Sequence, residues 1–396
     1  LIASGHRSVS IGKLHYRSTD DDNGFDEEIM PLHVVDGVGD LLGLIRDDLP
    51  VRTAALKLAA EAGPGDSSYQ RYDDDITSSA QRWLRNEAPK HRDKPWVLFV
   101  SLVCPHFPLK SREAFYGLYP EHAVPLPALY AQAERPDHPY IDALRRCMVY
   151  DEAFDETKVR RAIAAYFGMV TFVDDNVGKI LATLDETGLS EDTRIIYTSD
   201  HGDNLGARGL WGKSTMYEEA AGVPLIMAGP DVPQGIVCRE PVTLVDCFPT
   251  ILGAAGVPQH PDDRDLPGHS LFDLARGIAP RRTVLCEYHA AGGATGAFMT
   301  RHGPFKLVHY VGMPPMLFDL DRDPQERHDL GRDPGYQSLI RDCLHDLRRI
   351  LDPEEVDRRA RADQEARIAQ FGGREAILAR GSFGHSPIPG EKAVYT

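Results

Sequence analysis

A long amphipathic segment followed at once by an apolar one constrains the fold most. From Lys158 to Glu186, apolar residues recur every three or four positions, which predicts one buried face of a long helix. Gly188 stands just beyond the pattern, where helices commonly stop. Residues 193–198 read TRIIYT, a run of β-branched and aromatic side chains that is typical of a buried strand. A long helix leading into a buried strand predicts a layered α/β domain.

Shorter segments fit the same architecture. Strands are predicted at 8–11, 96–101 and 224–228, and a further helix at 246–255. A helix is also expected at 76–86, with Asp75 as its N-cap. The polar residues of 18–75 and the proline-rich stretch 109–150 predict mainly irregular structure, so we expect the acidic run 73–75 to be solvated.

The pattern changes after about residue 280. Short strands are predicted at 283–288, 296–300 and 305–310, joined by glycine turns, and a helix follows at about 335–350. We therefore predict an α/β domain over 1–280, a smaller α+β subdomain over 281–350, and a charged tail over 351–396.

The composition restricts the class of partner. The 396 residues include 44 basic and 60 acidic side chains, a formal charge of −16, which argues against binding nucleic acid through overall charge. No apolar run reaches the length of a membrane-spanning helix. Six scattered cysteines without a C-x-x-C pair favour a reducing compartment, hence the cytoplasm. Because the first residue is Leu1 rather than Met, a signal peptide would not be visible, and the periplasm stays an alternative.

Polar side chains follow three of the predicted strands. They are Lys13, His15, His106, Asp200 and His201, and Lys213 comes one loop later. The carboxyl ends of strands in an open α/β sheet meet at one edge, so we expect these groups to lie together. Lysine and imidazole donors there would bind a tetrahedral oxyanion. A carboxylate and a neutral imidazole would also ligate a divalent cation, although two ligands are too few for a closed site.

Each residue alone also has a structural interpretation. Lys13 and His15 would then belong to a solvated loop, His106 would bond a carbonyl between its prolines, and Lys213 would lie on the surface. Asp203 is interpreted as structural. The functional interpretation is favoured because the set occurs in order, at successive strand ends.

Five segments together carry a family resemblance. They are GKLH (12–15), CPHFP (104–108), TSDHGDNLG (198–206), GKSTMYEEAAGVPLI (212–226) and LFDLDRDPQERHDL (317–330), and they resemble the sulfatase family of the alkaline-phosphatase-like superfamily. Residues 286–310 are similar to its choline-sulfatase-like branch. The resemblance implies an α/β sandwich, with a large mixed, mostly parallel sheet between helices and a smaller C-terminal antiparallel sheet plus helix.

The resemblance also implies roles for the residues at the strand ends. Lys13, His15, His106 and Lys213 correspond to residues that hold the sulfate and assist the leaving group. Asp200 and His201 correspond to half of a site for one divalent metal ion, either Ca²⁺ or Mn²⁺. Where many sulfatases have Asn, this chain has His201, as in phosphonate monoester hydrolase and choline sulfatase relatives.

One expected motif has no counterpart before Lys13. In the family, a C-x-P-x-R or S-x-P-x-R motif, whose Cys or Ser becomes formylglycine, precedes GK-x-H. We therefore expect a sulfuric ester hydrolase whose formylglycine nucleophile lies upstream of this chain, acting on a small anionic sulfate or phosphate ester. Two alternatives stay open: a phosphonate monoester or phosphodiester hydrolase, and a truncated member that binds anions without turnover.

Two further expectations concern the C-terminal part. Glu287, Tyr288 and His289 lie where the smaller layer approaches the site mouth in related enzymes, and an acid beside an aromatic ring would recognise a cationic group. The alternative is an ordinary edge strand. The tail at 352–371 predicts a solvent-facing helix, and the resemblance implies contacts within a homo-oligomer, a dimer or a tetramer.

Overall fold

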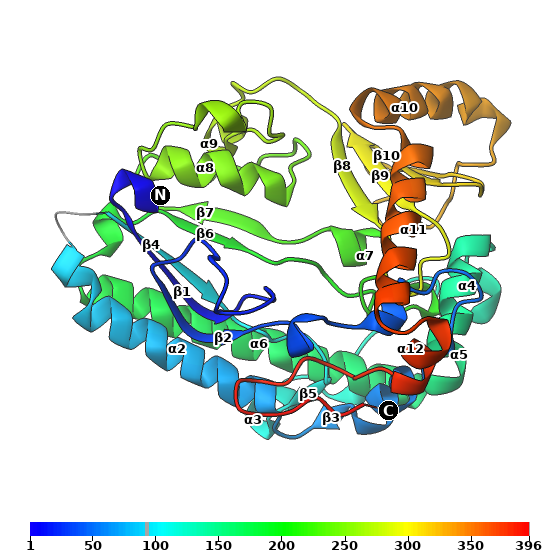
Figure 1. The fold of residues 1–396 in the computed structure, drawn as a ribbon, viewed down its shortest axis with the longest axis horizontal. Helices are drawn as coiled ribbons and strands as arrows, with labels where there is room; N and C mark the ends of the chain where they lie inside the picture. The colour runs from blue at the N-terminus through cyan, green and yellow to red at the C-terminus, as the bar shows by residue number, and fades with distance from the viewer. Residues whose placement is uncertain (92–94, 396) are drawn as a thin grey trace.

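The computed structural model describes residues 1–91 and 95–395 and is an α/β structure (Figure 1). The first sheet contains β1 (Arg7–Lys13), β2 (Glu27–Leu32) and β4 (Trp96–Ser101), parallel and in the order β2-β1-β4. Helix α2 (Ser68–Asn86) packs against β1, β4 and the long α6 (Glu156–Glu186). The strands predicted at 8–11 and 96–101 and the predicted long helix are therefore confirmed, whereas β2 was not predicted.

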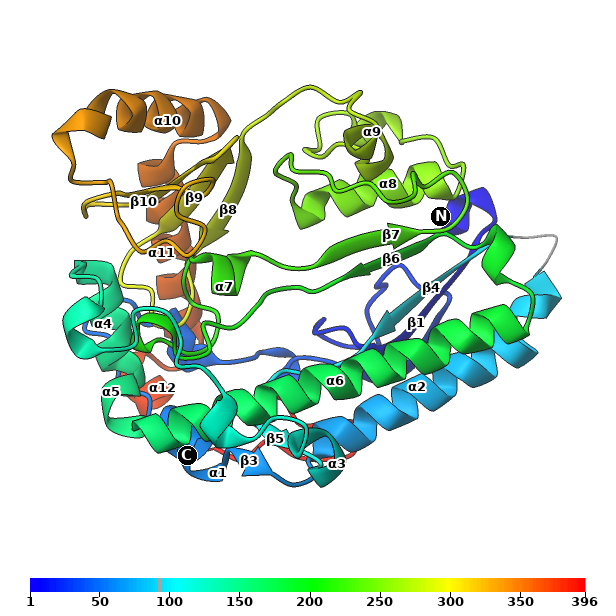
Figure 2. The ribbon, with the colours of Figure 1, turned by 180° about the vertical axis from the view of Figure 1, so that it is seen from behind.

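The strand after α6 belongs to a different pair. β6 (Ile195–Thr198) pairs with β7 (Leu225–Ala228) in antiparallel fashion, and α8 (Cys247–Ala254) and α9 (Leu271–Ala275) lie beyond them (Figure 2). The expectation of one large, mostly parallel sheet is corrected here. Within residues 1–91 and 95–395, β4 pairs only with β1 and β6 only with β7, so each strand keeps one free edge.

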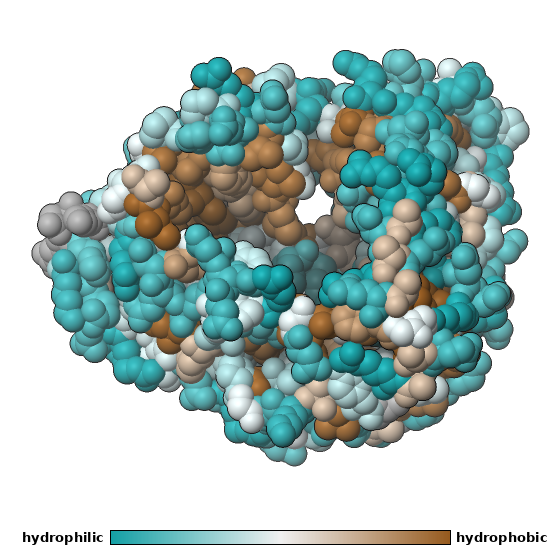
Figure 3. Space-filling view, viewed as in Figure 1, coloured by the Kyte–Doolittle hydropathy of each residue, from teal (hydrophilic) through white to brown (hydrophobic). Residues whose placement is uncertain are grey.

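Apolar side chains remain exposed beside these free edges. Phe99 on β4 is 47% exposed and Ile226 on β7 is 60% exposed. Figure 3 shows this face hollowed, with hydrophobic residues over β7 and α8. Val245 and Phe248, just before and within α8, are also exposed. Such edges expose unpaired backbone groups that are suited to pairing with another strand.

The C-terminal sheet is antiparallel, as predicted. Its order is β11-β10-β9-β8, formed by β8 (Val284–Tyr288), β9 (Ala297–His302), β10 (Phe305–Tyr310) and β11 (Met316–Asp319). Helix α10 (Gln337–Ile350) covers one face, where Leu307, Leu317 and Ile340 form a buried cluster.

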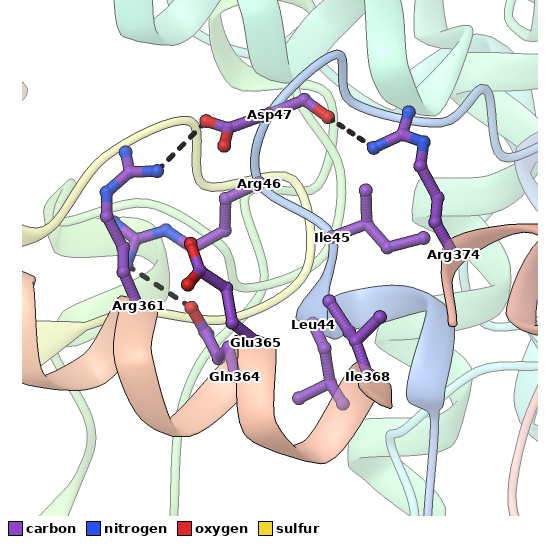
Figure 4. A pocket seen from close by; sticks show the side chains of 9 residues that line it. All are labelled: Leu44, Ile45, Arg46, Asp47, Arg361, Gln364, Glu365, Ile368 and Arg374. Atoms are coloured by element: carbon purple, nitrogen blue, oxygen red, sulfur yellow. Dashed lines mark hydrogen bonds and ion pairs between the residues drawn. The ribbon is translucent and has the colours of Figure 1, made fainter. Parts of the chain in front are cut away.

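The charged tail folds back onto the body of the molecule. It forms α11 (Pro353–Gln370) and α12 (Arg374–Arg380), and its residues Ile368 and Ile377 pack with Leu41, Leu42 and Ile45. The predicted helix is confirmed, but it does not face solvent on all sides. This packing leaves a cavity of about 90 Å³ (Figure 4), in which Arg361 and Arg374 bond the side chain and carbonyl of Asp47 respectively.

Two segments expected to be irregular contain regular structure. The segment 18–75 contains β2, α1 (Ala54–Glu61), the short strand β3 (Gly63–Pro64) and the first turns of α2. The segment 109–150 contains β5 (Lys110–Ser111), α3 (Glu113–Tyr116), α4 (Pro139–Met148) and the start of α5 (Tyr150–Ala153). Helix α2 begins earlier than predicted, because the Ser67 side chain accepts a hydrogen bond from Gln70 N and caps it.

None of the helices in the described part of the chain is both long and apolar enough to span a membrane.

Candidate active site

The ends of β1 and β6 bring the predicted lysines and metal ligands together. Lys13 closes β1, and its Nζ lies 3.3 Å from Asp200 Oδ2, just after β6. Lys213 returns from the next loop to place its Nζ 2.7 Å from His201 Nε2. Two cations therefore meet a carboxylate and an imidazole where two strands end, from segments about 200 positions apart.

The hydrogen bonds of His201 define its protonation pattern. Its Nδ1 lies 2.7 Å from the Gly202 carbonyl oxygen and must carry the proton to donate there. The Nε2 atom is then the acceptor for the Lys213 ammonium. His201 is thus a neutral imidazole with its lone pair directed into the site, the form in which imidazole binds metals.

His106 lies in the loop after β4, between the two cis prolines Pro105 and Pro108. Its Nδ1 bonds the Phe107 carbonyl oxygen at 2.8 Å, and its ring centroid lies 6.2 Å from that of His201. The third strand end therefore also delivers its histidine to the site, as predicted.

A buried acid that the sequence did not single out holds this loop. Asp73, fully buried in α2, accepts hydrogen bonds from Val103 N at 2.7 Å and Cys104 N at 2.8 Å. The prediction that 73–75 is a solvated run is wrong for this residue. The sequence does contain a pattern that predicts the burial of Asp73. Residue 73 lies on the same helix face as Tyr69, Tyr72 and Ile76, which are spaced by three and four positions.

A glycine allows the ends of β1 and β4 to approach closely. Gly12 has φ +103°, and a Cβ at this position would collide with the Ser101 carbonyl oxygen and lie 2.7 Å from Ile76 Cδ1. Only glycine adopts this conformation without strain. Gly12 thereby sets the position of Lys13, the next residue.

His15 stands at the exposed rim and bonds the far end of the chain. Its Nε2 lies 3.2 Å from Ser386 Oγ, and the Tyr69 hydroxyl donates to the Ser386 carbonyl oxygen at 2.6 Å. His385 packs its ring on Tyr69, with centroids 5.1 Å apart. Sequence reasoning missed this C-terminal contribution, since no periodicity or motif marks the segment.

Burial, assisted by the positive charge of the two lysines, keeps the histidines of the site neutral. Although His15 is exposed as a residue, the groups around its ring exclude enough water that this desolvation, and then Lys13 and Lys213, lower its pKa to about 4. Burial and the nearby Lys213 lower the pKa of His106 well below its usual value and lower that of His201. Burial, followed by repulsion from Lys13, also lowers the pKa of Lys213. At neutral pH the imidazoles therefore offer lone pairs and N–H groups rather than charge.

Asp200 is the one carboxylate in direct contact with these cations among the described residues. Its side chain is 63% exposed. Partial burial raises its pKa, but Lys13, His201 and Lys213 outweigh that effect and hold the pKa at about 2. Asp200 is thus ionised at physiological pH.

Asp203 has the structural role that the sequence suggested. It accepts hydrogen bonds from Leu205 N at 2.8 Å and Gly212 N at 3.0 Å, and burial raises its pKa. These bonds close the loop that carries Lys213 back toward the strand ends. The loop geometry therefore depends on a carboxylate that is separate from the reactive groups.

Buried charges tie the same loop to the C-terminal sheet. Arg208 is fully buried, pairs with Glu219 at 2.9 Å and donates to the Gln325 and Glu326 carbonyl oxygens. Lys306 of β10, also fully buried, binds Glu326 at 2.9 Å. The site loop is therefore held by both parts of the molecule.

The three residues expected to form a cation pocket, Glu287, Tyr288 and His289, do not point to the same face of the sheet. Tyr288 reaches the site loop, where its hydroxyl lies 2.8 Å from Ser214 Oγ beside Lys213. Glu287 and His289 lie on the other side, 3.6 Å apart, and His289 is 3.9 Å from Asp357 of α11. Alternate residues of a strand point to opposite faces, so Glu287 and Tyr288 do not form one pocket.

Asp200 and His201 are the two candidate ligands for a metal ion. Asp200 and His201 direct an oxygen and a neutral nitrogen to one place, which suits a divalent ion. Among residues 1–91 and 95–395, no group of three or more His, Cys, Asp or Glu side chains is arranged to hold a metal. These two donors fit part of a metal site and do not complete one.

Comparison with known proteins gives consistent matches over most of the chain. Residues 12–257 match the family model described as Sulfatase, and residues 206–352 match the model described as N-sulphoglucosamine sulphohydrolase, C-terminal. Choline-sulfatase from Rhizobium meliloti is 30% identical over 342 residues, which cover 84% of this chain and 66% of that protein. Arylsulfatase K from Danio rerio is 30% identical over 384 residues, or 89% of this chain and 67% of that protein.

The fold also has solved counterparts. The crystal structure of phosphonate monoester hydrolase of Agrobacterium radiobacter matches with a TM-score of 0.66 and 22% identity, covering 92% of this chain and 79% of that one. The chain spans about half to two thirds of the length of the curated relatives it matches.

Proposed function

The chain belongs to the sulfatase family, and from that premise we propose that it forms the anion-binding and acid–base part of a sulfuric ester hydrolase. In this reaction the sulfur–oxygen bond of the ester breaks, and water supplies a hydroxyl to sulfur and a proton to the leaving alcohol. The substrate would be a small anionic sulfate ester.

The observation that carries the proposal is the convergence of Lys13 and Lys213 on Asp200 and His201. The two ammonium groups repel each other, and this repulsion adds to the larger effect of burial in lowering the pKa of Lys213. A bound sulfate group relieves that repulsion and accepts charge-assisted hydrogen bonds from both. Donors held in place before the reaction stabilise the charge that develops on the oxygens of the ester.

The neutral histidines would complete the acid–base chemistry. His106 Nδ1 is occupied by a carbonyl oxygen, so its Nε2 is the atom available to the substrate. His15 at the rim would handle the proton of the leaving oxygen or of the reaction intermediate. General acid–base catalysis is most effective when the pKa of the group lies near the operating pH, and a bound anion would raise the lowered pKa values of both histidines toward that range.

The proposal includes a divalent ion, Ca²⁺ or Mn²⁺, for which Asp200 and His201 would supply two donors. When bound, the ion would polarise the oxygens of the ester. We further propose a formylglycine nucleophile on a segment outside these 396 residues. Support comes from the free edges of β4 and β6 and the exposed Phe99 and Ile226 beside them, which suit an added strand.

The test has a binding part and a turnover part. Sulfate titrated into the 396-residue chain should bind to wild type and much more weakly to Lys213→Ala, measured by calorimetry. The natively expressed protein should hydrolyse para-nitrophenyl sulfate, and its intact mass and peptide map should contain formylglycine. Sulfate binding that is unaffected by Lys213→Ala, or native protein without turnover, would contradict the proposal.

A phosphonate monoester or phosphodiester hydrolase is the second candidate. The Asp200–His201 pair favours it, because an imidazole beside the carboxylate resembles that group of relatives. A side-by-side measurement of kcat/KM for para-nitrophenyl sulfate and bis(para-nitrophenyl) phosphate separates the two functions. A preference for the diester would replace the sulfate ester as substrate.

A further inference from the structure

We propose that Ser386, in the loop after α12, is a positioning residue that fixes the imidazole of His15 in the site. The inference rests on the proposed function only where turnover is measured. Its starting point is the 3.2 Å separation between Ser386 Oγ and His15 Nε2, which joins positions 371 apart in the sequence.

The loop that carries Ser386 is anchored at several points. Phe383 and Tyr395 form an antiparallel bridge that closes its base. Arg380 donates to the Tyr395 hydroxyl at 2.7 Å, and Ile388 packs against the main core. The loop turns back from α12 along the side of the molecule that carries β3 and β5 (Figure 1).

The position of the Ser386 hydroxyl follows from these anchors. The Tyr69 hydroxyl donates to the Ser386 carbonyl oxygen at 2.6 Å, and His385 stacks edge-on against the Tyr69 ring. Because the backbone of Ser386 is already held, its hydroxyl is not needed to attach the loop. The Ser386 hydroxyl instead forms a hydrogen bond with the His15 ring.

His15 needs such a partner because it stands beyond the end of a strand. It has a φ of +57° and lies at the exposed rim, where nothing in β1 restrains its ring. Ser386 Oγ is the hydrogen-bond partner of this ring among residues 1–91 and 95–395. A hydrogen bond to Nε2 holds that ring atom in place and therefore limits the directions in which Nδ1 can point.

A structural role alone predicts different behaviour. If Ser386 served only to pack the loop, Ser386→Ala would alter stability and leave the His15 ring and kcat unchanged. A positioning role predicts a change in kcat with little change in KM, because substrate binding by Lys13 and Lys213 is intact. The conservative variant Ser386→Thr retains the hydroxyl, so its His15 ring position and its kcat should match those of wild type.

The first experiment needs no activity. Aromatic carbon–proton NMR spectra of the 396-residue chain, with the His15 signals assigned by comparison with His15→Gln, should show one sharp set for wild type and Ser386→Thr. In Ser386→Ala those signals should broaden or move toward the positions of a free histidine. Lys392→Ala, an exposed change on the same loop, is the matched control and should leave them unchanged.

The second experiment uses the native full-length protein with para-nitrophenyl sulfate. Ser386→Ala should lower kcat about tenfold, a fraction of what a positioned acid or base contributes, with KM within about twofold of wild type. Unchanged His15 signals together with unchanged kcat would overturn the proposal. A protein that turns over no ester at all contradicts the proposed function alone, and the NMR comparison still decides the role of Ser386.

Discussion

Asp73 offers the sharpest test of how the site is built. Its two carboxylate oxygens accept the Val103 and Cys104 amides at 2.7 and 2.8 Å, in a place closed to water. Asp73→Ala leaves both amides without an acceptor, whereas Asp73→Asn keeps one acceptor oxygen. The two variants therefore remove different numbers of hydrogen bonds from the same loop.

The expected costs follow from that count. A buried donor left without a partner costs about 1–3 kcal/mol, so Asp73→Ala should lower the free energy of unfolding by about 4 kcal/mol and Asp73→Asn by about 2. Asp75→Ala, an exposed change on the same helix, should stay within about 0.5 kcal/mol of wild type. The ratio of the two larger losses distinguishes lost hydrogen bonds from a general effect on α2.

The pH dependence of Asp73 has a defined sign. Burial raises its pKa to about 6, above the usual value of about 3.9 in an unfolded chain. Between about pH 3.9 and pH 6, Asp73 binds its proton more tightly in the native state than in the unfolded state. Asp73 therefore contributes stability at low pH, and this contribution is lost as the pH rises through about 6. The stability of Asp73→Asn relative to wild type should therefore improve between pH 4 and pH 7.

Urea unfolding followed by tryptophan fluorescence measures the free energies, and hydrogen exchange measures the loop itself. The Val103 and Cys104 amides should exchange faster in Asp73→Ala, and the native full-length protein should lose activity because His106 moves. A loss below about 1 kcal/mol for Asp73→Ala, the least that one orphaned donor should cost, would refute the reasoning, as would unchanged protection of the two amides.

Two further predictions address the site loop. Lys213→Ala should lower kcat/KM of the native protein by about 10²–10³, the usual loss for one preorganised donor, and an unchanged value in steady-state kinetics would exclude its role. Arg208→Ala should destabilise the chain by about 2–4 kcal/mol, because it leaves the Gln325 and Glu326 carbonyl oxygens and the partly buried Glu219 carboxylate without their donor. Thermal and urea unfolding of Arg208→Ala check this value, and a loss near zero would show that the buried pair is not needed.

Much of the site was predictable because its residues directly follow apolar runs. The strand expected at 96–101 has those bounds in the structure, and His106 follows it to the site. The same logic predicts that Lys13 and Asp200 lie together, and their side chains are 3.3 Å apart in the structure. A strand that ends at a sheet edge leaves little freedom to the next few residues.

The rest depends on pairings that local patterns do not encode. The run of β-branched and aromatic residues at 193–198 identifies β6 as a strand, but it does not reveal that β7 is the partner of β6 among the described residues. Ser386 lies 371 positions from His15 in a segment without periodicity, so only the folded chain reveals the contact. Asp73 was missed because a run of three acids indicates a surface, although the helical stripe places one of them inside.

The electrostatics of the site lead to one more prediction. Lys13 and Lys213 help to keep His15, His106 and His201 neutral, and the effect reverses when an anion binds between them. A bound sulfate raises the pKa of each histidine toward its usual value of about 6.5, so binding should take up protons between about pH 4 and 6.5. Calorimetric titration of the 396-residue chain at pH 5.5, in two buffers with different ionisation enthalpies, measures this uptake directly. Binding without proton uptake would contradict the assignment of neutral histidines, because histidines already charged in the free chain have no proton left to gain.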